Sequence, residues 1–122
     1  MKRQEIGRIG EEIACKYLIN KRYRILQRNY REKFGEIDII GKSSDGTLIF
    51  IEVKAIALTE AAILKPEDNF TPQKIRKVNK MCQFFAAAHP ELIDDEKGWR
   101  VDLITVEISQ NGEYTVRHYE NI

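Results

Sequence analysis

Apolar residues in two parts of the chain recur at the spacing of an amphipathic helix. Across residues 4–20 they fall three and four positions apart and line one helix face, formed by Ile6, Ile9, Ile13, Ala14, Tyr17 and Leu18. The same periodicity follows Thr71 and Pro72, which supply an N-cap and a proline at the first helical position. This second helix is expected to end near His89, because Pro90 comes next.

Five segments rich in β-branched and aromatic residues predict strands, at residues 23–30, 34–41, 47–55, 99–108 and 114–119. Turn residues join the second strand to the third and the fourth to the fifth, so both pairs are expected to form hairpins. The second and third strands are apolar on both alternating faces near their centres, which predicts helices on both sides of the sheet. Residues 56–70 have no clear periodicity and predict a long, mobile connection.

The order of these elements, αβββαββ, indicates the α/β class, with a mixed sheet flanked by helices. The chain has 122 residues, 43% of them hydrophobic, so we expect a single domain, residues 1–122, whose core needs no disulfide or metal. Cys15 and Cys82 lie on apolar helix faces and are expected to be reduced core residues. The N-terminus is charged and no apolar run approaches about 18 residues, so we expect a cytoplasmic protein with no membrane partner.

Charge is unevenly distributed, although the net charge is only +1. Residues 1–33 hold 10 Lys and Arg against 4 Asp and Glu, and residues 70–90 hold 4 against none. The other two parts are acidic, with 3 against 7 in residues 34–69 and 3 against 8 in residues 91–122. A phosphate-binding surface beside a carboxylate-lined site would give this pattern, and chance segregation is the alternative.

Three charged residues interrupt the apolar strands and point to a metal site. Asp38 stands in an isoleucine-rich strand, and Glu52 and Lys54 bracket Val53 on the next. Because side chains alternate along a strand, Glu52 and Lys54 share one face, and a tight hairpin brings Asp38 within reach. Two carboxylates at one point repel each other unless a cation lies between them, and oxygen ligands suit Mg²⁺ or Mn²⁺.

Lys54 is then placed to position an attacking water and to offset charge in the transition state of attack on phosphorus. The alternative is that Asp38, Glu52 and Lys54 form a partly buried ion-pair cluster at the open end of the sheet. His89 and His118 have no partner at metal-ligand spacing, so no zinc site is expected.

The spacing of Asp38, Glu52 and Lys54 resembles the signature of the PD-(D/E)XK nucleases, whose core has the element order αβββαβ. Nearly the whole chain resembles the YraN-like family of that superfamily, through the segments Gly7–Ala14, Arg28–Arg31, Gly35–Asp38, Phe50–Lys54 and Arg100–Asp102. That family is in turn similar to archaeal Holliday-junction resolvases. The resemblance implies a restriction endonuclease-like core and Mg²⁺-dependent hydrolysis of DNA phosphodiesters, on branched or otherwise structured DNA, by a symmetric homodimer.

The resemblance also implies a glutamate on the first helix near the metal, which is either Glu11 or Glu12. Glu12 has Arg8 and Lys16 four positions away on either side, which is typical of a solvated ion-pair stripe. Glu11 has small and apolar helical neighbours, so we assign Glu11 to the site as a catalytic residue and metal ligand. The alternative is that Glu11 only caps or buttresses the fold. Glu36 shares a face with Asp38 and is either a further ligand or a solvated residue.

The basic segments are expected to contact nucleic-acid phosphates, through Arg28, Arg31, Lys74, Lys77 and Lys80. Cations in the first turns of a helix oppose its dipole, which points to a role in binding a partner, and an ordinary solvated face is the alternative. Gln73 stands where some relatives place a polar residue that orients the water or the scissile phosphate. After Lys54 many relatives continue with arginines, whereas residues 55–58 here are apolar.

We therefore predict a metal-dependent DNA endonuclease in which Asp38, Glu52 and Glu11 hold Mg²⁺ or Mn²⁺ and Lys54 positions the water. The alternative is a catalytically inactive nuclease-fold module that binds nucleic acid or a protein partner.

Overall fold

A computed structural model of the protein describes residues 2–58 and 71–122. The elements are α1 (Arg3–Asn20), β1 (Arg24–Glu32), β2 (Gly35–Lys42), β3 (Leu48–Ala57), α3 (Pro72–Ala88), η2 (Pro90–Leu92), β4 (Trp99–Ile108) and β5 (Tyr114–Tyr119). Across these described residues the predicted order αβββαββ is confirmed, with the short 3₁₀ helix η2 in addition. Thr71 Oγ1 caps α3 by accepting a hydrogen bond from the Lys74 backbone N–H at 3.2 Å, as its N-cap position predicts.

The prediction that a connection without regular structure begins at residue 56 is wrong for its first two residues. Strand β3 continues through Ala57, because each of its residues from Leu48 onward keeps a partner on β4. The remainder of that connection, residues 59–70, lies outside the described residues.

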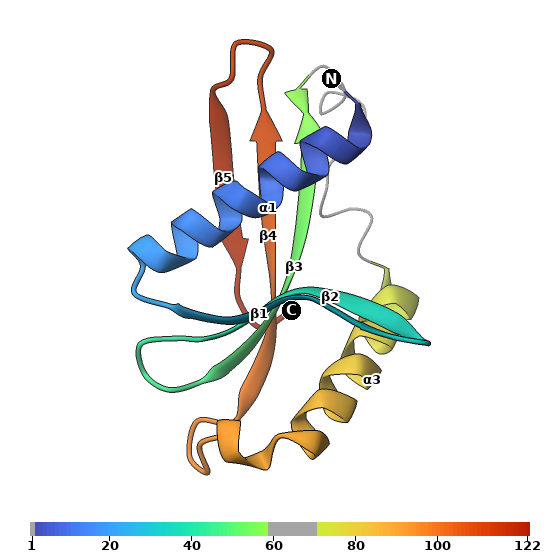
Figure 1. Ribbon diagram of the computed structural model, residues 1–122, viewed down its shortest axis with the longest axis vertical. Helices are drawn as coiled ribbons and strands as arrows, with labels where there is room; N and C mark the ends of the chain where they lie inside the picture. The colour runs from blue at the N-terminus through green and yellow to red at the C-terminus, as the bar shows by residue number, and fades with distance from the viewer. Residues whose placement is uncertain (1, 59–70) are drawn as a thin grey trace.

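The five strands form one mixed sheet in the order β1-β2-β3-β4-β5. Strands β3 and β4 are parallel and the other neighbours are antiparallel, so the chain between β3 and β4 makes a crossover that contains α3. The pairing between β2 and β3 covers only four positions, from Lys42 opposite Leu48 to Ile39 opposite Ile51. Beyond Ile39 the β1–β2 hairpin runs across the long strands instead of along them (Figure 1).

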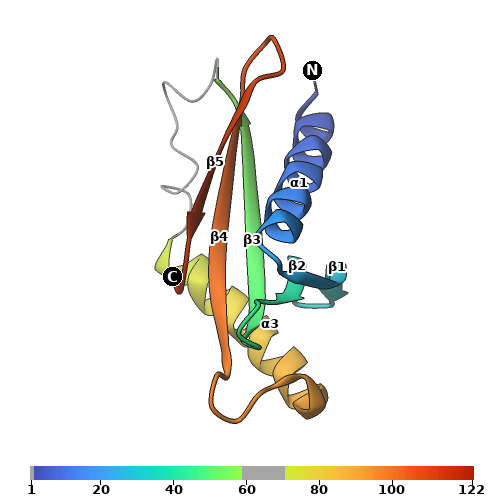
Figure 2. The ribbon, with the colours of Figure 1, turned by 90° about the vertical axis from the view of Figure 1, so that its left-hand side faces the viewer.

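Helices cover both faces of the sheet, as the two-sided apolar pattern predicts (Figure 2). The core under α1 includes Ala14, Leu18, Ile39, Ile49, Ile51 and Ile104. The core under α3 includes Ile37, Ile40, Phe50, Met81, Cys82 and Phe85. The mixed α/β architecture is compatible with the restriction endonuclease-like fold expected from the sequence.

Gly10 allows α1 to lie directly on the sheet. A Cβ atom at this position would overlap the Cβ of Ala55 on β3, so only glycine permits the approach. The next residue, Glu11, is thereby held against the sheet surface.

The two cysteines are both free and buried, on opposite faces of the sheet, which confirms their prediction as reduced core residues. No helix in residues 2–58 or 71–122 is long and apolar enough to cross a membrane.

Candidate functional site

Asp38 occupies the fork where β2 leaves β3. The backbone N–H of Val53 points toward the departing strand, where no backbone carbonyl remains to accept from it. Asp38 Oδ2 accepts this hydrogen bond instead, at 2.8 Å. The bond fixes the carboxylate of Asp38 beside β3, one residue from Glu52, and confirms that the hairpin brings the two predicted acids together.

Glu52 projects from the face of β3 that carries Leu48 and Phe50 and is covered by α3. Its Oε1 atom is buried and has no hydrogen-bond partner among the described residues. Burial and then the negative charge of Asp38 raise the pKa of Glu52 to about 9, although a hydrogen bond with the backbone of Asp38 opposes the rise. A buried acid with one unpartnered oxygen is a ready ligand for a cation.

The pKa of Asp38 is also raised, to about 6. Burial is the largest cause, and the negative charges of Glu11 and Glu36 add to it, whereas the hydrogen bond from Val53 and the cation of Lys54 oppose it. Asp38 and Glu52 thus share a site in which two ionised carboxylates are unfavourable without a compensating positive charge.

Glu11 and Glu12 differ in burial as predicted. The Glu11 side chain is 22% exposed and its Oε1 atom is buried without a hydrogen-bond partner, whereas Glu12 is 59% exposed. Burial raises the pKa of Glu11, and Arg28, whose Nη2 atom is 4.0 Å from Glu11 Oε1, opposes that rise. Glu12 pairs with Arg28 Nη1 of β1 at 2.7 Å and not with the helical neighbours that the sequence suggested.

Lys54 lies on the same strand face as Glu52 and its side chain is exposed. It forms no salt bridge with Asp38 or Glu52, so these three residues do not make the ion-pair cluster that their spacing also allowed. Lys54 is nevertheless close enough for its charge to lower the pKa of Asp38. Its ammonium group is therefore available to a ligand at the carboxylates.

Thr105 is a residue of this region that the sequence analysis missed. It is the β4 partner of Lys54, is only 1% exposed, and its hydroxyl has no hydrogen-bond partner among the described residues. A threonine in a strand is common, so nothing in the sequence distinguishes it.

The donor set fits a small divalent cation held by two carboxylates. Across residues 2–58 and 71–122, no group of three or more His, Cys, Asp or Glu side chains is gathered closely enough to hold a metal ion. Mg²⁺ commonly binds through one or two carboxylates and keeps several waters. The carboxylates of Asp38 and Glu52 meet this requirement, since Glu52 Oε1 has no hydrogen-bond partner among the described residues. Glu36 is 40% exposed and pairs with Arg31 at 3.4 Å, which matches the solvated alternative for that residue.

Comparison with known proteins assigns the chain to a family. The model of the uncharacterised protein family UPF0102 matches residues 10–106, a range that contains Glu11, Asp38, Glu52 and Lys54. The chain belongs to UPF0102. It is 37% identical over 112 residues to the UPF0102 protein of Persephonella marina, a match that covers 92% of this chain and 90% of the relative. It is 36% identical over 118 residues to the one of Alkaliphilus oremlandii, with 97% of each chain covered.

UPF0102 is the YraN-like family that the sequence segments resemble, a nuclease-like family of the PD-(D/E)XK superfamily. The family prediction is confirmed. The names of these relatives state no activity, so the roles of the individual residues rest on the geometry of this chain.

One of the segments that carry the UPF0102 resemblance, Arg100–Asp102, builds a second polar cluster on the opposite face of the sheet. The fully buried Asp102 accepts hydrogen bonds from Arg100 Nε at 3.0 Å, His118 Nε2 at 2.7 Å and the Asn121 backbone N–H at 2.9 Å. Burial alone would raise the pKa of Asp102, but these hydrogen bonds lower it. Tyr17 of α1 bonds to His118 Nδ1 at 3.1 Å, so the cluster ties α1 to β4 and β5 and stabilises the fold.

The cations predicted to meet phosphate divide into two groups in this UPF0102 protein. Arg28 and Arg31 of β1 are already paired with glutamates. Lys74, Lys77 and Lys80 are exposed on α3, a helix with four Lys or Arg residues and no acid, and none of the three forms a salt bridge with a described residue. Gln73 is exposed in the first turn of the same helix. Of the cations predicted to contact phosphate, those on α3 are therefore the ones that have no salt bridge with a described residue.

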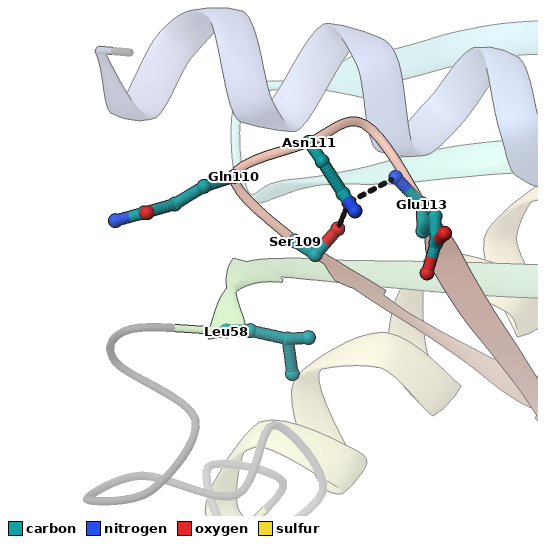
Figure 3. Close-up of a pocket in the computed structure, with 5 residues that line it drawn as sticks. All are labelled: Leu58, Ser109, Gln110, Asn111 and Glu113. Carbon is teal, nitrogen blue, oxygen red and sulfur yellow. Dashed lines mark hydrogen bonds between the residues drawn. The ribbon is translucent and has the colours of Figure 1, made fainter.

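A pocket elsewhere on the molecule does not coincide with these residues. It lies between the end of β3 and the β4–β5 turn and is lined by Leu58, Ser109, Gln110, Asn111 and Glu113 (Figure 3). Leu58 is six residues beyond Glu52, about 20 Å along an extended strand. The hydrogen bond from the Glu113 backbone N–H to Asn111 Oδ1, at 3.2 Å, belongs to the hairpin turn and indicates no ligand.

Proposed function

We propose that this protein is a metal-dependent endonuclease that hydrolyses phosphodiester bonds in DNA, with branched or otherwise structured DNA as its substrate. The observation that carries the proposal is the buried pair Asp38 and Glu52, in which both pKa values are raised and Glu52 Oε1 has no partner among the described residues. Family membership and a compatible fold support it.

The carboxylates of Asp38 and Glu52 would together hold one Mg²⁺ or Mn²⁺ ion. When bound, the cation would activate water and polarise the phosphodiester for attack. Glu11 Oε1 is buried and has no hydrogen-bond partner among the described residues, and the charge of Glu11 acts on both Asp38 and Glu52. Glu11 can therefore orient the ligands of the cation through water.

Lys54 supplies the positive charge that the reaction needs on the substrate side. Its ammonium group is exposed, lies on the face of Glu52 and is not held by Asp38 or Glu52. It can donate hydrogen bonds to the attacking water and to a phosphate oxygen, where negative charge grows during the reaction.

Helix α3 is the surface proposed to bind the DNA backbone. Its exposed cations Lys74, Lys77 and Lys80 neutralise phosphates, and Gln73 at its start can hydrogen-bond a phosphate oxygen. The carboxylates of the site would otherwise repel DNA, so these cations and the metal act together.

A cleavage assay on single-stranded, duplex, flap and four-way DNA tests the proposal. We expect cleavage with Mg²⁺ or Mn²⁺, none with EDTA, and none by Glu52→Gln, which keeps the shape of the side chain. Glu12→Gln, at an exposed position on α1, is the matched control and should cleave as the wild type does. If no substrate is cut, or if Glu52→Gln cuts at the wild-type rate, the chain is instead a non-enzymatic module of the same fold.

A further inference from the structure

Two phenylalanines are exposed side by side at the β1–β2 turn. Phe34 in the turn is 42% exposed, and Phe84 on α3 is 48% exposed. Their rings meet edge to face, with centroids 5.4 Å apart. The neighbouring Phe85 is only 3% exposed and belongs to the core, so α3 places one phenylalanine inside and the other outside.

The turn that carries Phe34 is fixed against α3. A Cβ at Gly35 would lie 3.0 Å from Met81 Cγ, so the hairpin and the helix are in close contact at this point. The position of Phe34 beside Phe84 follows from this packing. The exposed aromatic pair is therefore held in place by the fold.

Positive charge lies beside the pair on α3. The Nζ atom of Lys80 is 5.9 Å from the centre of the Phe34 ring. Phe84, Lys80, Lys77 and Gln73 are three or four positions apart, so they form one exposed stripe on α3. We call Phe34, Phe84, Lys80 and Lys77 the aromatic–lysine surface.

We propose that the aromatic–lysine surface binds unpaired bases of a single-stranded DNA segment next to the bond that is cleaved. Bases of single-stranded DNA stack on exposed aromatic rings while neighbouring cations follow the phosphates, and this surface has both parts. The bases of a blunt duplex are already stacked inside the helix, so a duplex can use only the lysines. The absence of any acid from α3 favours a polyanion over a second copy of the chain as the occupant.

This inference rests on the proposed function and narrows its substrate class. Phe34 lies in the turn directly before β2 and precedes Asp38 by four residues, so the two residues are at most about 13 Å apart along the chain. One strand of a duplex advances about 3.4 Å per nucleotide and an unpaired strand can extend further, so about four nucleotides or fewer span that length. An unpaired segment bound at the phenylalanines thus continues to the carboxylates within a few nucleotides, which favours tailed, flap and branched substrates over blunt duplexes.

Fluorescence titration with oligonucleotides that carry 2-aminopurine tests the inference, because stacking on an aromatic ring quenches that base. The titrations are made in EDTA, so that no cleavage occurs, with a single-stranded oligonucleotide and a blunt duplex. For Phe34→Ala and Phe84→Ala we expect about tenfold weaker binding of the single strand, with loss of the quenching, and less than about twofold change for the duplex. Phe84→Trp should bind as the wild type does.

Tyr114→Ala is the matched control, because Tyr114 is an exposed aromatic residue on β5, 57% exposed. It should change neither titration, and melting temperatures will show whether each variant is folded. Equal weakening for single strand and duplex, or no binding of single strands by the wild type, would overturn the inference. So would a wild-type dimer, seen by sedimentation, that Phe84→Ala dissociates.

Failure of this inference and failure of the proposed function give different results. If the wild type cleaves DNA but the phenylalanine variants bind single strands normally, only the aromatic–lysine surface is wrong. If the wild type binds single strands through the phenylalanines but cuts no DNA with Mg²⁺ or Mn²⁺, the binding surface stands and the nuclease proposal fails.

Discussion

Asp38 Oδ2 accepts a hydrogen bond from the backbone N–H of Val53 at 2.8 Å, at the point where strand β2 separates from strand β3. This bond gives Asp38 a structural role in addition to the proposed one in metal binding. It satisfies a donor that the diverging strands leave without a backbone acceptor, and it fixes the carboxylate beside Glu52.

The two roles of Asp38 can be separated by substitution. Asp38→Ala leaves the Val53 N–H without its acceptor and should cost about 1–3 kcal/mol of stability. Asp38→Asn keeps an oxygen acceptor and removes the repulsion with Glu52, so its melting temperature should equal or exceed that of the wild type. Both variants should lose cleavage. Thermal denaturation and the cleavage assay check this, and an asparagine variant as unstable as the alanine variant would contradict it.

The two glutamates of α1 should behave differently. Glu11→Gln should weaken metal binding or turnover at least about tenfold, as loss of a residue that supports the ligands commonly does. Glu12→Gln should change neither, because Glu12 is 59% exposed and pairs with Arg28 at the surface. Manganese titration and initial cleavage rates measure the difference, and equal behaviour of the two variants would remove Glu11 from the site.

Substitution of Lys54 separates chemistry from folding. Lys54→Ala should abolish cleavage, because no other cation is assigned to the attacking water. DNA affinity and melting temperature should stay nearly unchanged, since the side chain is exposed and makes no salt bridge with a described residue. A large loss of stability would instead indicate a structural ion pair, whose disruption in a buried setting costs about 3–5 kcal/mol.

The raised pKa of Glu52 predicts a pH-dependent stability of the metal-free protein. Burial, followed by the charge of Asp38, raises this pKa from 4.5 to about 9. Between these two pH values the folded state retains a proton that the unfolded state releases. The contribution of the protonated Glu52 to the free energy of unfolding is therefore complete below pH 4.5 and is lost as the pH rises toward 9. In EDTA at pH 8, Glu52→Gln should melt at least about 3 °C above the wild type, and the difference should shrink in acid. Parallel profiles of melting temperature against pH for the two proteins would contradict this.

Local sequence signals predicted most of the fold. The periodicity of α1, the cap formed by Thr71 and Pro72, and the two hairpin turns each act over a few residues. The order of the described helices and strands, and their limits to within two residues, could therefore be predicted. The proximity of Asp38 and Glu52 also followed from the sequence, because strand alternation and one tight turn are sufficient to determine it.

Features that depend on tertiary packing could not be predicted. The separation of β2 from β3, and with it the Val53 hydrogen bond, arises from the course of the whole hairpin. No residue near His118 in the sequence suggests a partner for its ring, yet its Nε2 atom is hydrogen-bonded to Asp102 on the neighbouring strand. The exposure of Phe34 and Phe84 contradicts what their hydrophobicity alone suggests, since only the packing of the turn on α3 places both rings outside the core.

Calorimetric titration with Mn²⁺ measures whether Asp38 and Glu52 form a metal site, and it needs no DNA substrate. We predict that the wild type binds one Mn²⁺ per chain, that Glu52→Gln and Asp38→Asn abolish this binding while remaining folded, and that Glu12→Gln preserves it. Absence of binding to the folded wild type, or undiminished binding to Glu52→Gln, would show that Asp38 and Glu52 do not form a metal site.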